Sequence, residues 1–146
     1  MKTQVRGTIK IERMPGCSLV RTIAPFPFYS AILKRWSEIP LGFIYDEESV
    51  PVLRGTNPEA GAIHDYLCRK DSDPVVDKLT AALVYREFIA YYNSIEPQQT
   101  NKIKAYLNSV YDYIKMRIKP DAVIVAPGYF HKLPVMATLE QVQKAL

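Results

Sequence analysis

The first fifty residues alternate between apolar and polar positions, with the period of two that is typical of half-buried strands. Extended segments are predicted at residues 3–12, 18–29, 32–39 and 39–45. Pro25 and Pro27 place the second of these at a sheet edge or an irregular end, because proline donates no ladder hydrogen bond. Phe43 is expected to point inward. The N-terminal third is therefore predicted to form a small antiparallel sheet.

After Pro51 the apolar residues recur at spacings of three and four, which predicts helices at residues 58–69, 74–92 and 97–117. Asn57 and Asp73 are the predicted N-caps of the first two, since each precedes a proline suited to the first helical turn. The residues available for a buried face on the second helix are Val75, Val76, Leu79, Leu83 and Ile89.

The C-terminal part contains a short apolar run at residues 122–126, between two prolines, which is strand-like. Thr138 and Gln141 then form a capping-box pattern that opens a helix to residue 146. The predicted fold class is α+β, with a small N-terminal antiparallel sheet followed by a three-helix half and a short C-terminal strand and helix. We expect a single domain over residues 1–146, mainly β over 1–51, helical over 57–118, with a C-terminal extension over 119–146.

Length and composition fit this single domain, because 146 residues suffice to bury a core of their own. The longest apolar runs are far shorter than the ~20 residues of a membrane-spanning helix, so no transmembrane segment is expected. The first residues lack the hydrophobic core of a signal peptide, which predicts synthesis and folding in a cytoplasm. Cys17 and Cys68 are accordingly expected to be free thiols.

Charge is unevenly distributed along the chain. Residues 1–40 hold seven Lys/Arg and two Asp/Glu (+5), residues 41–100 hold five and ten (−5), and residues 101–146 hold seven and three (+4). The acidic middle favours a cation over a phosphate or a nucleic acid as its ligand. The basic flanks are not dense runs and are interpreted as solvated faces, so no sequence-specific nucleic-acid partner is predicted.

Candidate chemistry centres on the adjacent His64 and Asp65. The two side chains diverge on a helix, so no strong mutual pair is expected. Asp77, placed one turn into the next helix, is predicted to orient His64 as a catalytic base. Asp65 would face the loop from Gly42 to Asp46, where carboxylate and carbonyl oxygens are suited to Ca²⁺. The residues leave two interpretations open, a catalytic and metal site or a buried polar network that pins the loop to the helix.

Other candidate residues have structural interpretations. Ser49 is interpreted as a turn residue in preference to a nucleophile, because Val50 and Pro51 do not form a strand-to-helix elbow. Tyrosines crowd the two long helices and are consistent either with an assembly surface or with the edge of the core; they include Tyr85, Tyr91, Tyr92, Tyr106, Tyr111 and Tyr113.

The His-Asp arrangement resembles the calcium-dependent secreted phospholipases and the related domain of parvovirus capsids. In those proteins a helix carries His-Asp-x-x-Tyr, and His64 and Asp65 match its first two positions. Cys68 stands where the tyrosine would be. The resemblance implies a calcium-dependent esterase or hydrolase acting at a host envelope. His64 and Asp77 would be catalytic, and Asp65, Asp46 and Gly42 would hold the metal.

A longer stretch resembles a bacteriophage and prophage family of unknown function (DUF1353-like). The matching segments are Ile39-Pro40-Leu41-Gly42-Phe43-Ile44-Tyr45-Asp46, Ser49-Val50-Pro51, Ala62-Ile63-His64-Asp65-Tyr66-Leu67 and Val76-Asp77, in that order. The resemblance implies a virion structural protein from the tail, baseplate or neck. Such a protein is made in the host cytoplasm and assembles with other phage structural proteins or with copies of itself.

Overall fold

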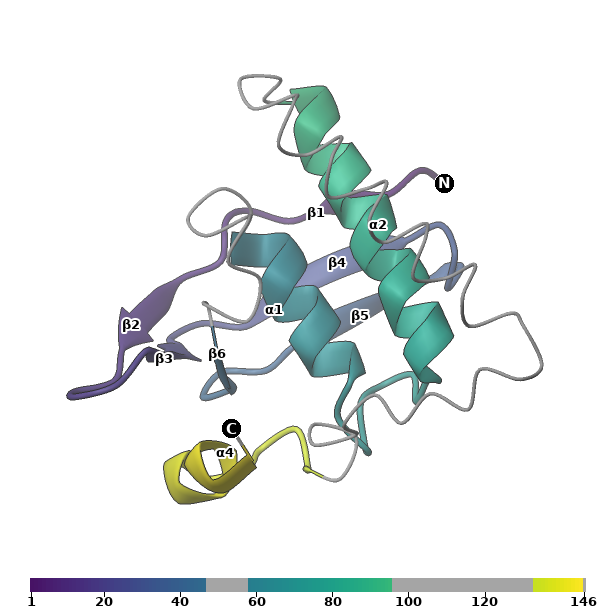
Figure 1. Cartoon of the computed structure of the whole chain (residues 1–146). Coiled ribbons are helices and arrows are strands. Elements are labelled where there is room, and N and C mark those ends of the chain that lie inside the picture. The colour runs from purple at the N-terminus through teal and green to yellow at the C-terminus, as the bar shows by residue number, and fades with distance from the viewer. Residues whose placement is uncertain (47–57, 96–132, 146) are drawn as a thin grey trace.

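A computed structural model describes residues 1–46, 58–95 and 133–145 (Figure 1). Strands come first and helices follow, so the predicted α+β class is confirmed. The described strands are antiparallel and form two sheets of three, in the orders β1-β4-β5 and β2-β3-β6. They are β1 (Gln4–Val5), β2 (Ile11–Arg13), β3 (Leu19–Thr22), β4 (Phe26–Ser30), β5 (Arg35–Ile39) and β6 (Ile44–Asp46).

The prediction of one small sheet is wrong, because two of the predicted strands each divide between two sheets. The segment at residues 3–12 breaks at Gly7, whose φ of 78° lies outside the strand region. The segment at residues 18–29 breaks between Thr22 and Phe26. Backbone hydrogen bonds bracket the crossover, from Ile23 N–H to the Lys10 carbonyl at 2.9 Å and from Arg6 N–H to the Pro27 carbonyl at 3.1 Å. Both segments thus pass from one sheet to the other at neighbouring positions, where they are hydrogen-bonded to each other.

Pro27 lies in the central strand β4, so the predicted edge position is also wrong. The carbonyl of Pro27 accepts from Arg6, just beyond the end of the two-residue strand β1. In an antiparallel strand the nitrogen and carbonyl of one residue face the same neighbour. The missing N–H of Pro27 therefore faces the place where the ladder with β1 ends, and little pairing is lost.

Two helices, α1 (Pro58–Leu67) and α2 (Lys78–Ile95), pack across one face of the β1-β4-β5 sheet (Figure 1). Phe28 of β4 forms the centre of this contact, with its ring centroid 5.6 Å from that of Phe88 and 6.3 Å from that of Tyr66. Phe43 is fully buried, as predicted. The core that positions α1 is therefore largely aromatic.

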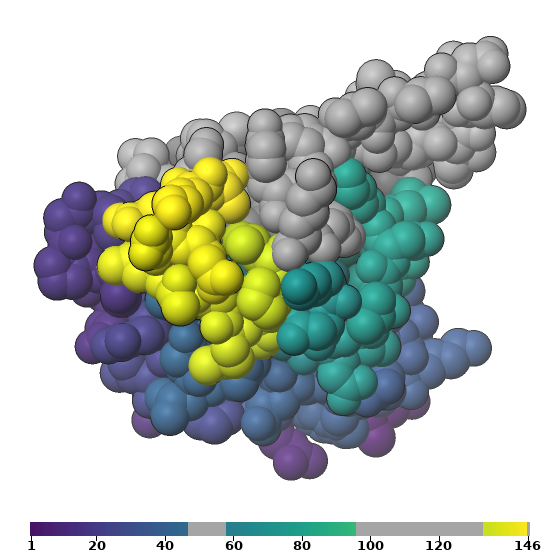
Figure 2. All heavy atoms as spheres, turned by 90° about the horizontal axis from the view of Figure 1, so that it is seen from below, coloured from purple at the N-terminus to yellow at the C-terminus, as the bar shows by residue number. Residues whose placement is uncertain are grey.

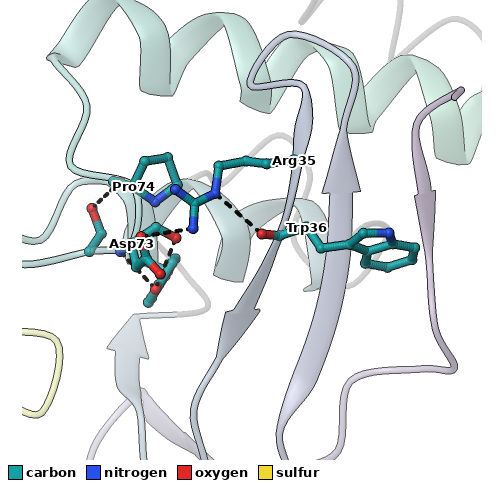
Figure 3. Close-up of polar contacts among 6 residues, drawn as sticks. Arg35, Trp36, Asp73 and Pro74 are labelled. Atoms are coloured by element: carbon teal, nitrogen blue, oxygen red, sulfur yellow. Dashed lines mark hydrogen bonds and ion pairs between the residues drawn. The ribbon is translucent and has the colours of Figure 1, made fainter.

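The connection between α1 and α2 is fixed to strand β5 (Figure 3). Arg35 of β5 forms an ion pair with Asp73 at 3.0 Å, and the backbone N–H of Asp73 donates to the Tyr66 hydroxyl at 2.9 Å. The Asp73-Pro74 peptide bond is cis. Asp73, which contacts Arg35 and Tyr66, lies outside the helix, and α2 begins at Lys78, four residues later than predicted.

The buried face of α2 also differs from the prediction. Ile89 is buried, but Leu79 and Leu83 are only partly buried and Val75 is 69% exposed. Because the helix starts later, Val75 and Val76 precede it and are not part of its apolar stripe. The face that packs against α1 and the sheet consists of Ala81, Val84, Tyr85, Phe88 and Ile89.

The C-terminal segment lies against β6 and the α1–α2 connection, where Figure 2 shows the lime and yellow residues beside blue and teal ones. Lys70 N–H donates to the Leu133 carbonyl at 3.0 Å, and Val135 N–H donates to Asp71 Oδ1 at 2.6 Å. Helix α4 (Leu139–Ala145) follows.

The capping box at α4 is confirmed. The Thr138 N–H donates to Gln141 Oε1 at 2.8 Å, and the Gln141 N–H donates to Thr138 Oγ1 at 3.3 Å. The described residues contain three helices, α1, α2 and α4. The predicted helix at 97–117, the strand at 122–126, the cap Asn57 and Ser49 lie outside the described residues.

Candidate functional site

His64 lies in the last turn of α1 and contacts three side chains. Its Nδ1 is 3.4 Å from Oδ1 of Asp65, and its Nε2 is 3.6 Å from Sγ of Cys68. The imidazole packs against the Tyr85 ring of α2 with a centroid distance of 4.9 Å and an interplanar angle of 32°. The two ring nitrogens thus have partners in α1 and in the residue directly after it, and α2 supports the ring from one face. The side chain of His64 keeps 29% exposure.

The contact between His64 and Asp65 was not expected from their divergence on a helix. The distance of 3.4 Å exceeds the 2.7–3.2 Å of an ordinary hydrogen bond. The interaction of the two side chains is therefore mainly electrostatic. The Asp65 side chain is only 4% exposed, and its Oδ2 has no hydrogen-bond partner in the part of the chain that the structure describes. A buried carboxylate of this kind requires a nearby positive charge.

Asp77 is placed differently from the prediction. It is the N-cap of α2, where its Oδ1 accepts from the Thr80 N–H at 2.7 Å. Among the described residues, the contacts of His64 are with Asp65, Cys68 and Tyr85, and Asp77 is not one of them. The prediction put Asp77 one turn inside a helix that begins at Pro74, and the later start of α2 moves the side chain to the helix end.

Cys68 is the neighbour of His64 that the sequence interpretation overlooked. It follows the last residue of α1, and its N–H still donates to the His64 carbonyl at 3.0 Å. Residues four apart on a helix face one another, so the His64-to-Cys68 spacing was the available signal. Cys68 is a free thiol, as is Cys17, in agreement with the prediction of no disulfide.

The environment of His64 changes its acidity in two opposing ways. Burial is the largest effect and lowers the pKa, because it penalises the imidazolium. The negative charge available on Cys68, together with hydrogen bonding and charge from Asp65, more than offsets it and raises the pKa of His64 from 6.5 to about 10. The position of His64 in the last turn of α1 favours the same charged form through the helix dipole.

This raised pKa predicts how stability depends on pH. Because the folded-state pKa lies above the unfolded value of 6.5, the contribution of His64 is fully present below pH 6.5. It is lost as the pH rises through about 10. We expect the difference in free energy of unfolding between wild type and His64→Gln, measured by urea denaturation, to shrink steadily from pH 6.5 to 10.

Cys68→Ala is the control for this pH series, because it removes the partner of Nε2 and leaves Asp65 and Tyr85 in place. The pH dependence contributed by His64 is expected to be weaker in that background. A wild-type-minus-mutant difference that stays constant with pH would contradict the raised pKa.

The loop predicted to contribute to a calcium site also binds an arginine side chain. Arg69 is buried at 1% exposure, and its guanidinium donates to the Ile44 carbonyl at 2.6 Å and to the Pro134 carbonyl at 3.1 Å. Its Cζ lies 4.7 Å from the centroid of Phe43. Burial lowers the pKa of Arg69, and the charges of Asp65, Cys68 and Asp71 partly offset this. Arg69 thus adds a positive charge near the buried Asp65, besides the His64 imidazolium, whose Nδ1 is 3.4 Å from Oδ1 of Asp65.

Gly42 and Asp46 take structural places in the same loop. Gly42 has a φ of 86°, which suits glycine, and its N–H donates to the Thr22 carbonyl at 2.9 Å. Asp46 ends β6, opposite Leu19. In the described residues, no three His, Cys, Asp or Glu side chains gather as metal ligands. The Ile44 carbonyl, one backbone oxygen of this loop, is bound by Arg69, and calcium binding remains a prediction to test.

Glu87 of α2 accepts a second set of tertiary hydrogen bonds, which the sequence interpretation did not predict. Its carboxylate accepts from the Ser30 hydroxyl at 2.5 Å, from the Ala31 N–H at 2.6 Å and from the Thr3 hydroxyl. These donors belong to the end of β4, to the turn that follows it and to the N-terminal segment. The local sequence carries no signal for this contact, since the partners are 56 to 84 residues away along the chain.

Comparisons with known proteins identify no relative. The chain matches no protein-family model, no curated protein and no solved structure.

Proposed function

We propose that this chain is a structural protein of a bacteriophage particle, a component of the tail, baseplate or neck. The order of its motifs supports this proposal through the resemblance to a phage family, and the packing of those motifs supports a structural role for them. The observation that carries the second point is Arg69, which links two of the motif segments. Its guanidinium donates to the Ile44 carbonyl in the segment at residues 39–46, and its charge lies near Asp65 in the segment at residues 62–67.

In this proposal the His-Asp motif fixes helix α1 to the loop at residues 42–46. Phe43 lies beneath the guanidinium of Arg69, and the Pro134 carbonyl brings the C-terminal segment to the same cation. A buried charge that binds two carbonyls and packs on a ring fixes the relative placement of the elements that supply them. The motif would then keep a rigid surface in shape for assembly with other phage structural proteins or with copies of this chain.

Association with the particle tests the virion role directly. Phage particles from an induced host culture would be purified on a density gradient and analysed by quantitative mass spectrometry. We expect this chain to co-sediment with the capsid and tail proteins at a fixed ratio, and to be present in the host cytoplasm before lysis. A phage enzyme of replication, which stays in the lysate, is the control. Absence from intact particles at the level of that control would overturn the proposal.

A second candidate function is a hydrolase that uses His64 at the host envelope, in the manner of the calcium-dependent phospholipases. The placement of His64 favours it, because a partly exposed imidazole with a carboxylate on Nδ1 is suited to proton transfer. When bound, Ca²⁺ would supply polarisation of an ester carbonyl. The neighbours of Arg69 argue against the metal, as described above.

None of the helices in the described residues is long and apolar enough to span a membrane.

Thermal unfolding with excess Ca²⁺ and with chelator separates the two candidates. We expect no difference between the two conditions, because Arg69 already binds the Ile44 carbonyl and Asp65 already has the positive charges of His64 and Arg69 near it. A bound cation at 100 times its Kd would add about 2.7 kcal/mol to the free energy of unfolding. Stabilisation by Ca²⁺ that is absent in Asp65→Asn would contradict this expectation and support the calcium-dependent hydrolase.

A further inference from the structure

A thiol and an imidazole lie together at the end of α1. Sγ of Cys68 is 3.6 Å from Nε2 of His64, and the thiol forms no disulfide. The carboxylate of Asp65 is next to Nδ1 of the same imidazole, and the Tyr85 ring packs against the face of that imidazole. A carboxylate only accepts hydrogen bonds, so Nδ1 carries a proton and Nε2 is the nitrogen that exchanges a proton with the sulfur. Sulfur, imidazole and carboxylate therefore form one continuous chain of contacts.

The charges around Cys68 favour a nucleophile. His64 lies on one side of the sulfur, and the guanidinium of Arg69 is close enough for Cys68 to raise the pKa of that arginine. Cysteines next to cationic groups are the ones that react as nucleophiles. The His64 side chain is 29% exposed, so its edge is open to a small molecule and to water.

We propose that Cys68 is a nucleophile that accepts short acyl groups from small esters, with His64 holding and returning the proton. The small exposed area at Cys68, 9% of the residue, restricts the acyl group to a short one such as acetyl. This site requires neither calcium nor the virion role, and it differs from the calcium-dependent hydrolase in that the acyl group is carried on the protein.

The reaction is balanced in protons and bonds. The proton shared by Sγ and Nε2 resides on the imidazole while the sulfur attacks the carbonyl carbon and forms the C–S bond. The tetrahedral intermediate collapses, the bond from carbon to the leaving oxygen breaks, and the imidazolium gives that oxygen its proton. Water then attacks the thioester, the imidazole accepts a proton from it, and the C–S bond breaks to release the carboxylic acid. No atom is oxidised or reduced.

Cys17 is a control within the same molecule. It is more exposed than Cys68, and its thiol approaches the Met14 carbonyl at 3.8 Å. No described contact joins it to an imidazole. If exposure alone decided reactivity, Cys17 would react first. Activation by His64 predicts the opposite order.

The test is acylation of the full chain by p-nitrophenyl acetate at neutral pH with chelator present. Release of p-nitrophenolate gives the rate, and peptide mass mapping after an acid quench gives the acylated residue. We expect Cys68 to be acetylated at least ~10-fold faster than Cys17, and His64→Gln to slow acetylation of Cys68 by about 100-fold. Cys17→Ser is expected to retain the full rate, and Cys68→Ser to lose it.

Two results would overturn the proposal. One is acetylation of Cys17 at a rate equal to or above that of Cys68 in the wild-type chain, a comparison that needs no variant to fold. The other is acetylation of Cys68 at an unchanged rate in His64→Gln, with the fold of that variant checked by its thermal unfolding. Inhibition by chelator would assign the ester hydrolysis to the calcium-dependent candidate instead.

Discussion

Arg69→Met is expected to lower the free energy of unfolding by about 3–5 kcal/mol, the cost of breaking a buried charge interaction by removing one partner. Methionine keeps much of the side-chain volume and removes the guanidinium. The Ile44 and Pro134 carbonyls then lose their donors, and buried Asp65 loses the positive charge near it. Urea denaturation followed by circular dichroism measures the change.

Arg21→Met is the matched control, because it makes the same substitution at an exposed ion pair. Arg21 bonds to Glu12, and the two side chains are 45% and 44% exposed. Exposed pairs contribute about 1 kcal/mol or less, so this variant is expected to be nearly as stable as wild type. Arg69→Lys is expected to fall between wild type and Arg69→Met, since an ammonium lacks the planar fork that reaches two carbonyls. Equal losses in Arg69→Met and Arg21→Met would contradict the role assigned to Arg69.

Glu87→Ala is expected to lower the free energy of unfolding by about 3 kcal/mol. Each hydrogen bond to a charged group contributes about 1.5–3 kcal/mol, and the contributions of one shared carboxylate do not add fully. The loss leaves the Ser30 hydroxyl, the Ala31 N–H and the Thr3 hydroxyl without their common acceptor. The turn after β4 and the N-terminal segment would detach from α2 before the rest of the fold. Hydrogen exchange at Ala31 and Ile32 reports this local opening.

The control for Glu87 is Glu140→Ala in α4. Glu140 pairs with Lys144 at 2.9 Å, and both side chains are about three-quarters exposed, at 75% and 76%. A loss of less than about 0.5 kcal/mol is expected for such a helical pair. Glu87→Gln keeps one acceptor oxygen and is expected to lie between Glu87→Ala and wild type. Unchanged exchange at Ala31 in Glu87→Ala would show that the turn is held by its own hydrogen bonds instead.

Much of the fold follows from local pattern. The alternation at the N-terminus places strands before helices, Pro58 begins α1, and the Thr138 capping box opens α4, all within reach of a few neighbouring residues. The inward position of Phe43 and the free thiols were also predicted correctly. These features depend on interactions between residues close in sequence, or on composition, so the sequence specifies them directly.

The candidate site was predicted less well. The sequence singled out His64 and Asp65, which the structure places in contact, but their expected partner Asp77 caps α2, and Asp73 lies outside that helix in an ion pair with Arg35. Cys68, which contacts His64, was treated only as a departure from a motif. A difference of four residues in the start of one helix was enough to change which carboxylate lies near the histidine.

The sequence by itself determined the α+β order, the capping box of α4, and the i, i+4 spacing that pairs His64 with Cys68. Only the tertiary structure decided that two continuous segments divide between two sheets, that Glu87 holds the turn after β4, and that Arg69 binds the Ile44 and Pro134 carbonyls. The physical reason is the range of the interaction. A cap or a helical pair is closed by residues three or four apart, whereas the carbonyls that bind Arg69 lie 25 and 65 residues away and meet it only once the core has packed.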